Sequence, residues 1–115
     1  MIPGAESLVA ELGSWPDFHD AEVLELVLRR EGVSCLVVQP AKAGGIPPEK
    51  AAAPIRFSFE GIVDLELADF SSQNVIASLV CLVTANGWRV TLSPCFGLAG
   101  YIEARSVAVS GGEPN

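Results

Sequence analysis

Cysteines and basic side chains are scarce in this chain, and their scarcity excludes several classes of protein. Three cysteines, Cys35, Cys81 and Cys95, are odd in number and widely spaced, so they predict neither a disulfide framework nor a zinc-finger pattern. Seven basic residues stand against fourteen acidic ones, a net charge of −7, whereas nucleic-acid binding draws on clustered lysines and arginines. We therefore expect a reduced, cytoplasmic protein that has no nucleic-acid partner.

Long apolar runs are also missing. No run of about 18 apolar residues is present, so we expect no membrane span and no membrane partner. The segment MIPGAESLVAELG at the start has no basic stretch ahead of an apolar one, and we expect no secretory signal there. A length of 115 residues, half of them hydrophobic and 18% charged, is enough for one core. The sequence therefore predicts a single domain over residues 1–115.

The hydrophobic pattern predicts one helix followed by strands. The helix covers Ser7 to Gly13, because Leu8 and Leu12 share a face and glycine commonly ends a helix. Alternating and β-branched runs predict six strands at 21–30, 33–38, 56–67 with a bulge or bend at Gly61, 75–84, 88–93 and 99–109. Loops are expected at 40–54, 70–74 and 93–97, and a hairpin turn at Asn86–Gly87.

Two of these segments permit another interpretation. A helical stripe also fits 21–30, and periodicity alone does not separate a strand from a buried helix at 75–84. The turn signals favour strands in both places. Because the connections are too short for parallel crossovers, the predicted fold class is α+β, with an N-terminal helix packed on a mainly antiparallel sheet of about six strands.

The densest polar cluster in the sequence lies between the helix and the first strand. It contains one imidazole and three carboxylates: Asp17, His19, Asp20 and Glu22. These groups could serve as a general base or as metal ligands. On an extended chain, however, His19 points away from Asp20 and Glu22. We therefore expect no metal and no cofactor, and we interpret Asp17 or Asp20 as binding backbone amides while a neighbouring carboxylate holds His19. A role in surface recognition is the alternative.

The cysteines do not predict a catalytic site. Cys95 lies in a predicted loop and could act as a nucleophile with His19 as its base, but nothing in the sequence brings the two together. Cys35 and Cys81 lie inside apolar runs and are expected to be inert. The segment Gly97 to Gly100 lacks the lysine of a phosphate-binding loop and is interpreted as a turn. We expect no catalytic residue among them.

Four carboxylates form what we call the acidic stripe: Glu60, Asp64, Glu66 and Asp69. No lysine or arginine lies among them, and we expect Val63, Leu65 and Leu67 on the opposite, core-facing side of the strand. A solvated sheet face explains the stripe, since charge also protects a sheet from edge-to-edge aggregation. The functional alternative is an electrostatic field that steers a basic partner toward the sheet.

One segment resembles a known family. Trp15–Glu22, WPDFHDAE, resembles the WPxFHDAE signature of the immunity protein 50 family of bacterial polymorphic toxin systems. The resemblance continues at 59–65 and 70–76 and at the Gly97-x-x-Gly100 segment, so it covers about 15–105. It implies a cytoplasmic antidote without catalytic activity that binds and neutralises a toxin. It supplies neither the identity of the toxin nor the contact residues.

The sequence therefore predicts a toxin-neutralising immunity protein whose partner is a cognate toxin domain. The expected partner-binding surface combines the acidic stripe with the polar cluster: Asp17, His19, Asp20, Glu22, Glu60, Asp64, Glu66 and Asp69. Two alternatives stay open. One is a small metal-dependent or acid–base enzyme in which His19, Asp20 and Glu22 converge in a pocket. The other is a self-assembling structural module, for which a large exposed apolar patch and a homodimer are the signs.

Overall fold

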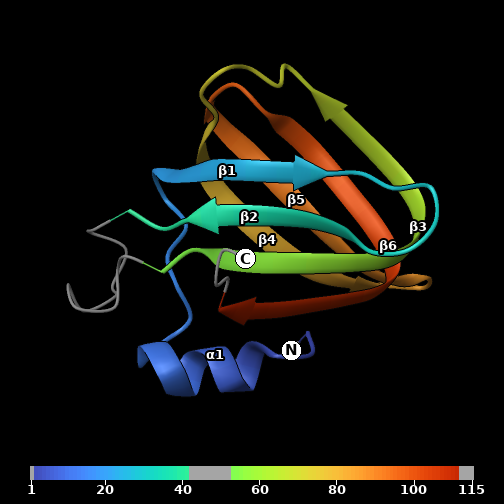
Figure 1. The fold of residues 1–115 in the computed structure, drawn as a ribbon, viewed down its shortest axis with the longest axis horizontal. Helices are drawn as coiled ribbons and strands as arrows, with labels where there is room; N and C mark the ends of the chain where they lie inside the picture. Colours follow the sequence, from blue (N-terminus) through green and yellow to red (C-terminus); the bar gives the residue numbers. More distant parts are fainter. Residues whose placement is uncertain (1, 42–52, 112–115) are drawn as a thin grey trace.

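The computed structural model describes residues 2–41 and 53–111 and shows one helix followed by six strands (Figure 1). The elements are α1 Ala5–Leu12, β1 Ala21–Val27, β2 Ser34–Gln39, β3 Ile55–Ala68, β4 Val75–Thr84, β5 Gly87–Phe96 and β6 Ala99–Gly111. Each pairing between these strands is antiparallel. The predicted α+β fold, a helix on an antiparallel sheet of six strands, is confirmed.

The sheet closes on itself, which the sequence pattern did not predict. The strand order is β1-β2-β3-β6-β5-β4, and β4 pairs back onto β1. This closing seam contains only two residue pairs, Ala21 with Ile76 and Glu22 with Val75. Two backbone hydrogen bonds extend it, from Asp20 N–H to the Ile76 carbonyl (2.9 Å) and from Val23 N–H to the Asn74 carbonyl (2.8 Å). The barrel is therefore closed by a short and local contact.

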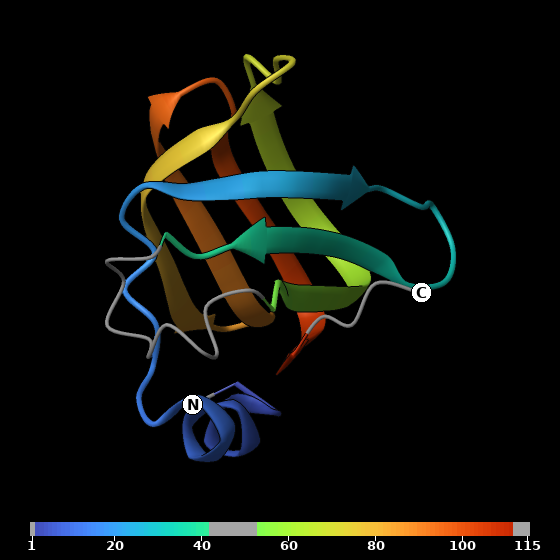
Figure 2. The ribbon, with the colours of Figure 1, turned by 60° about the vertical axis from the view of Figure 1, so that its left-hand side comes forward.

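The helix α1 lies below the strands in both views and packs against β6 (Figures 1 and 2). Its buried side chains Ala5, Leu8 and Leu12 join the core inside the barrel. Gly13 ends the helix as predicted, with a positive φ and its N–H bonded to the Val9 carbonyl.

Among the described residues, no helix is long and apolar enough to cross a membrane.

Several predicted boundaries shift in the structure. β3 runs through Gly61, which has a positive φ of 67°, and a register shift follows between Ile62 and Asp64, so the predicted irregularity is confirmed. β5 extends to Phe96 where a loop was expected from residue 93, because its last residues still pair with the start of β4. Cys95 therefore lies on a strand and not on a loop. Residues 42–52 of the predicted 40–54 loop lie outside the described residues.

The two halves of β3 differ in burial. Ile55, Phe57 and Phe59 are buried between the neighbouring strands β2 and β6. Beyond Phe59, β3 pairs only with β6, because β2 has no residue left to pair with it. Val63 and Leu65 are each 39% exposed, so the expectation that they belong to the core is wrong, whereas Leu67 packs partly buried against the core as expected. The cause is the difference in length between β2 and β3.

Candidate functional site

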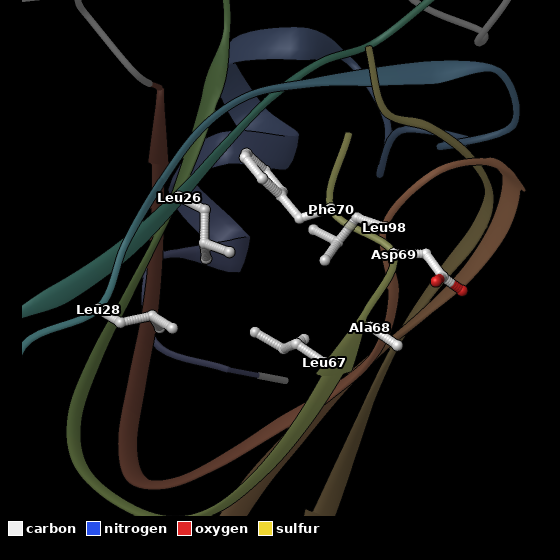
Figure 3. A pocket seen from close by; sticks show the side chains of 7 residues that line it. All are labelled: Leu26, Leu28, Leu67, Ala68, Asp69, Phe70 and Leu98. Atoms are coloured by element: carbon white, nitrogen blue, oxygen red, sulfur yellow. The ribbon is translucent and has the colours of Figure 1, made fainter. Parts of the chain in front are cut away.

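An apolar cleft opens beside the second half of β3. It has a volume of about 450 Å³ and is lined by Leu26, Leu28, Leu67, Ala68, Asp69, Phe70 and Leu98. Figure 3 shows the leucines and Phe70 around one common space, with the Asp69 carboxylate pointing away from it. The cleft lies between the end of β1 and the end of β3, where no strand of residues 2–41 or 53–111 pairs with the second edge of β3.

The loop after β3 holds Phe70 in place at this cleft. The buried Asn74 accepts hydrogen bonds at Oδ1 from the backbone N–H of Ser71 and of Leu98, both at 2.9 Å. Its Nδ2 donates to the Ser71 carbonyl at 2.8 Å. Phe70 stays exposed on this fixed loop. Clusters of exposed apolar side chains of this kind mark interaction sites more often than random surface does.

The acidic stripe divides into two parts. Asp64 accepts a hydrogen bond from the Tyr101 hydroxyl (2.9 Å), and its carboxylate lies 4.0 Å from the Arg89 guanidinium. Glu60, Glu66 and Asp69 are exposed and make no hydrogen bond or ion pair within the part of the chain that the structure describes. Asp64 therefore serves the barrel itself, and Asp69 borders the cleft. Glu66 directly precedes the cleft residue Leu67 in the sequence and stands opposite Tyr101 on β6.

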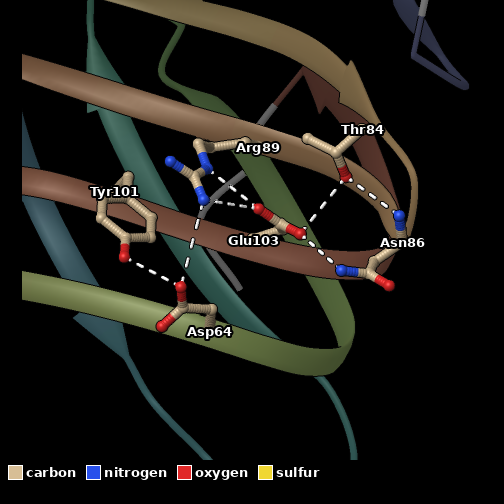
Figure 4. A network of polar contacts seen from close by, with 6 residues as sticks. All are labelled: Asp64, Thr84, Asn86, Arg89, Tyr101 and Glu103. Atoms are coloured by element: carbon tan, nitrogen blue, oxygen red, sulfur yellow. Dashed lines mark hydrogen bonds and ion pairs between the residues drawn. The ribbon is translucent and has the colours of Figure 1, made fainter.

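Asp64 belongs to a polar network on the outer face of β3, β6 and β5 (Figure 4). The centre of the network is Glu103, which is only 5% exposed. Its carboxylate accepts hydrogen bonds from Asn86 Nδ2 (3.0 Å), from Arg89 Nε (2.9 Å) and from Thr84 Oγ1 (3.3 Å). A further contact joins Arg89 Nη2 to the carboxylate at 2.8 Å. Hydrogen bonds from Asn86 and Arg89 lower the pKa of Glu103.

The sequence analysis missed this network. Arg89 stands opposite Glu103, and Glu103 stands opposite Asp64, so three separate strands supply the charges. The Arg89 guanidinium also lies over the Tyr101 ring, 4.1 Å from its centroid. The hydrogen bond to Asp64 raises the pKa of Tyr101. The sequence shows these groups only as single charged residues inside apolar strands. Which of them face one another depends on the register between the strands, and the sequence does not give that register.

The segment from Trp15 to Asp20 forms a tight connection into β1. Asp17 Oδ1 accepts a hydrogen bond from His19 N–H (2.9 Å), and His19 Nε2 lies 3.6 Å from Asp20 Oδ2. The interpretation that Asp17 binds a backbone amide is thus confirmed, whereas the hydrogen-bond partner of the His19 ring is the Ala77 carbonyl, 3.2 Å from Nδ1. The Trp15 and Phe18 rings pack edge to face at 5.8 Å, which anchors the segment to the core.

The expectation that His19 and Asp20 diverge is wrong. Asp20 has a positive φ of 64°, which turns its carboxylate back toward the His19 ring. Aspartate is one of the few residues that tolerate this conformation. The Cys95 thiol lies 3.7 Å from Asp20 Oδ1, and ligand atoms of His19, Asp20 and Cys95 all lie within 4.8 Å of one another. In the described chain, Cys95 rather than Glu22 completes this group.

The three cysteines have different surroundings. Desolvation and then the hydrogen bond to Asp20 raise the pKa of the exposed Cys95. Burial raises the pKa of Cys81 to about 11, in keeping with the inert role expected for it. Cys35 is buried, and its sulfur lies 3.3 Å from the Arg56 guanidinium.

Comparison with known proteins adds no assignment: no protein-family model, no curated protein and no solved structure matches this chain. The resemblance to the immunity protein 50 family therefore depends on the sequence motifs alone. A proposal about function must depend on the cleft, the charges beside it and the cluster around Asp20.

Proposed function

We propose that this chain is a toxin-neutralising immunity protein that binds a cognate bacterial toxin domain through the apolar cleft and the carboxylates beside it. The observation that carries this proposal is Phe70, an exposed aromatic side chain held by an ordered loop at the edge of a leucine-lined cleft. Protein interfaces place aromatic anchors in an apolar centre and surround them with polar groups. Such a protein acts by covering a surface of its partner.

The charge distribution favours a basic partner. No lysine or arginine occurs between Arg56 and Arg89, a stretch that includes the second half of β3 and the loop at the cleft. Glu66 and Asp69 therefore present negative charge that the same segment does not neutralise. A toxin surface with an apolar projection and basic residues around it fits this arrangement, since complementary charge speeds association. The cytoplasm is the compartment we propose, where the free cysteines stay reduced.

Co-expression with the toxic domain encoded directly upstream tests the proposal. The wild-type chain should restore growth, and Phe70→Ala should abolish or strongly weaken the rescue, because truncation of an aromatic anchor commonly costs about 2 kcal/mol or more of binding energy. Phe96→Ala is the matched control. Phe96 is 58% exposed and Phe70 is 60% exposed, but Phe96 does not line the cleft.

The outcomes test the choice of toxin and the choice of binding surface separately. Failure of the wild-type chain to restore growth excludes that toxin as the partner. Equal loss of rescue by Phe70→Ala and Phe96→Ala excludes the cleft as the binding surface, provided that circular dichroism shows both variants folded. Selective loss with Phe70→Ala supports the proposal.

Self-assembly is a second candidate that one observation favours. Three apolar residues of β4, Val80, Leu82 and Val83, are exposed, and β4 pairs with β1 only at Val75 and Ile76. Among the described residues no strand pairs with the rest of that edge, which a strand from a second copy could occupy. Light scattering across protein concentrations decides the question: a homodimer supports self-assembly, and a monomer at all concentrations excludes it.

A further inference from the structure

His19, Asp20 and Cys95 bring a nitrogen, an oxygen and a sulfur ligand to one place on the surface. Cys95 is 75 residues from Asp20 in the sequence, and the fold unites them at the seam between β1, β4 and β5. Their ligand atoms lie within 4.8 Å of one another. We propose that these three residues bind one zinc ion or a similar transition metal.

The separations between the ligand atoms are close to those of a tetrahedral site. Zinc–ligand bonds of about 2.0–2.3 Å at tetrahedral angles place neighbouring ligand atoms about 3.3–3.7 Å apart. His19 Nε2 lies 3.6 Å from Asp20 Oδ2, and Cys95 Sγ lies 3.7 Å from the other carboxylate oxygen, Oδ1, while one ligand atom from each of the three residues lies within 4.8 Å of the others. Small side-chain rotations therefore suffice to reach the separations of a tetrahedral site. A mixed set of imidazole, carboxylate and thiolate suits zinc, whereas magnesium and calcium prefer oxygen ligands alone.

The imidazole is already oriented as a ligand. His19 Nδ1 lies 3.2 Å from the Ala77 carbonyl oxygen, which accepts only from the tautomer that carries the proton on Nδ1. That tautomer leaves the Nε2 lone pair directed toward Asp20. Metal-binding histidines characteristically donate their other ring N–H to a carbonyl or carboxylate in this way.

The backbone around Asp20 is also fixed. Its N–H donates to the Ile76 carbonyl at 2.9 Å, and the His19 N–H donates to Asp17 at 2.9 Å. The ligands therefore need little reordering when the metal binds. All three ligand residues are exposed, so the metal can enter from solvent, and three protein ligands leave a fourth position for water.

The proposed metal would reinforce the weakest closure of the barrel. The seam between β1 and β4 has only two residue pairs, and the site joins the residues before β1 to the end of β5, which pairs with β4. This role goes beyond toxin binding and does not depend on it. Binding to the folded chain should raise the melting temperature as the metal concentration rises.

Calorimetric titration of the full chain with zinc tests the site, and cobalt provides a spectroscopic probe of a tetrahedral thiolate complex. We expect one equivalent of zinc, a rise in melting temperature and thiolate-to-cobalt absorption. Cys95→Ser and Asp20→Asn should each weaken zinc binding at least about tenfold. Asparagine tolerates the positive φ of Asp20, so this variant removes a charged ligand without straining the backbone.

Cys81→Ala is the matched cysteine control, because Cys81 lies on β4 outside the cluster. It should bind zinc and cobalt as the wild type does. Absence of saturable zinc binding by the wild-type chain overturns the proposal. Full affinity in Cys95→Ser, or the same loss in Cys81→Ala as in Cys95→Ser, overturns it as well.

Discussion

The two halves of β3 show how one strand serves two purposes. Ile55 to Phe59 have a strand on each side, and their inward side chains form the centre of the core. Within the part of the chain that the structure describes, Val63 to Ala68 have a strand on one side only, and this half borders the apolar cleft. The same alternating pattern gives a core in one half and an exposed surface in the other, because neighbouring strands decide what is covered.

The two halves are also held by different forces. The first half is stabilised by apolar burial around Phe57 and Phe59. The second half carries Asp64, whose contacts with Tyr101 and Arg89 connect it to the network around Glu103 on β6. Apolar packing therefore stabilises the first half of β3, Ile55 to Phe59, which we call the closed half. A polar network supports the outer face of the second half, Val63 to Ala68, which we call the open half.

The largest expected effect separates the halves by stability. Phe57→Ala should lower the free energy of unfolding by about 3–5 kcal/mol, because it removes a fully buried ring that packs on Phe18. Leu65→Ala should cost about 1 kcal/mol or less, because Leu65 is partly exposed already. Urea denaturation measures both. Equal losses would show that the second half is part of the core after all.

The next largest expected effect is a loss of thermal stability in acid, when Glu103 at the centre of the polar network becomes protonated. The pKa of Glu103 in the folded chain lies below the ordinary value of 4.5, so its contribution to stability is present above that value. It is lost as the pH falls through the lower pKa of the folded state. We expect the melting temperature of the wild type to fall over that acidic range.

Glu103→Gln isolates this contribution. The variant should melt several degrees lower than the wild type at neutral pH, and the difference should shrink as the pH falls below the ordinary glutamate range, since the wild type then loses the same charge. Glu66→Gln is the control, because Glu66 lies outside the hydrogen bonds of the network. A difference between Glu103→Gln and wild type that stays constant with pH would contradict the assignment.

Local patterns predicted the elements of this fold well. Gly13 ends the helix as predicted, because this signal acts through neighbouring residues. A two-residue turn also joins β4 and β5, but its residues are Ala85 and Asn86 and not Asn86 and Gly87, since Gly87 already pairs with Thr84 as the first residue of β5. Barrel closure was not predicted, since it depends on two residue pairs between strands distant in sequence. The cleft was missed for a related reason: it arises from the lengths of β2 and β3 compared with each other.

The candidate metal cluster shows the same limit. The ring of His19 and the carboxylate of Asp20 diverge on an extended chain, and only the positive φ of Asp20 brings them together. That φ is supported by a hydrogen bond to Ile76 and becomes visible only in the fold. Cys95 reaches the cluster because β5 continues past residue 93, where the proline and glycine signals predicted a loop.

The smallest expected effect tests the charge beside the cleft. If the proposed function holds, the double reversal Glu66→Lys with Asp69→Lys should slow association with the toxin about tenfold at low salt and leave dissociation nearly unchanged. The difference should fade at high salt, because screening weakens steering between exposed charges. Asp64 is left unchanged, since its reversal would disturb Tyr101 and Arg89. Stopped-flow mixing at several salt concentrations provides the rates.

The double reversal Glu6→Lys with Glu11→Lys makes the same change in net charge on exposed positions of α1, which contributes no residue to the lining of the cleft. If both double variants slow association equally, the effect comes from the overall charge of the chain. The open half of β3 would then differ from the closed half in shape alone. If only the double reversal of Glu66 and Asp69 slows association, the effect depends on where the charge lies. The open half of β3 then combines an apolar contact surface with local charge.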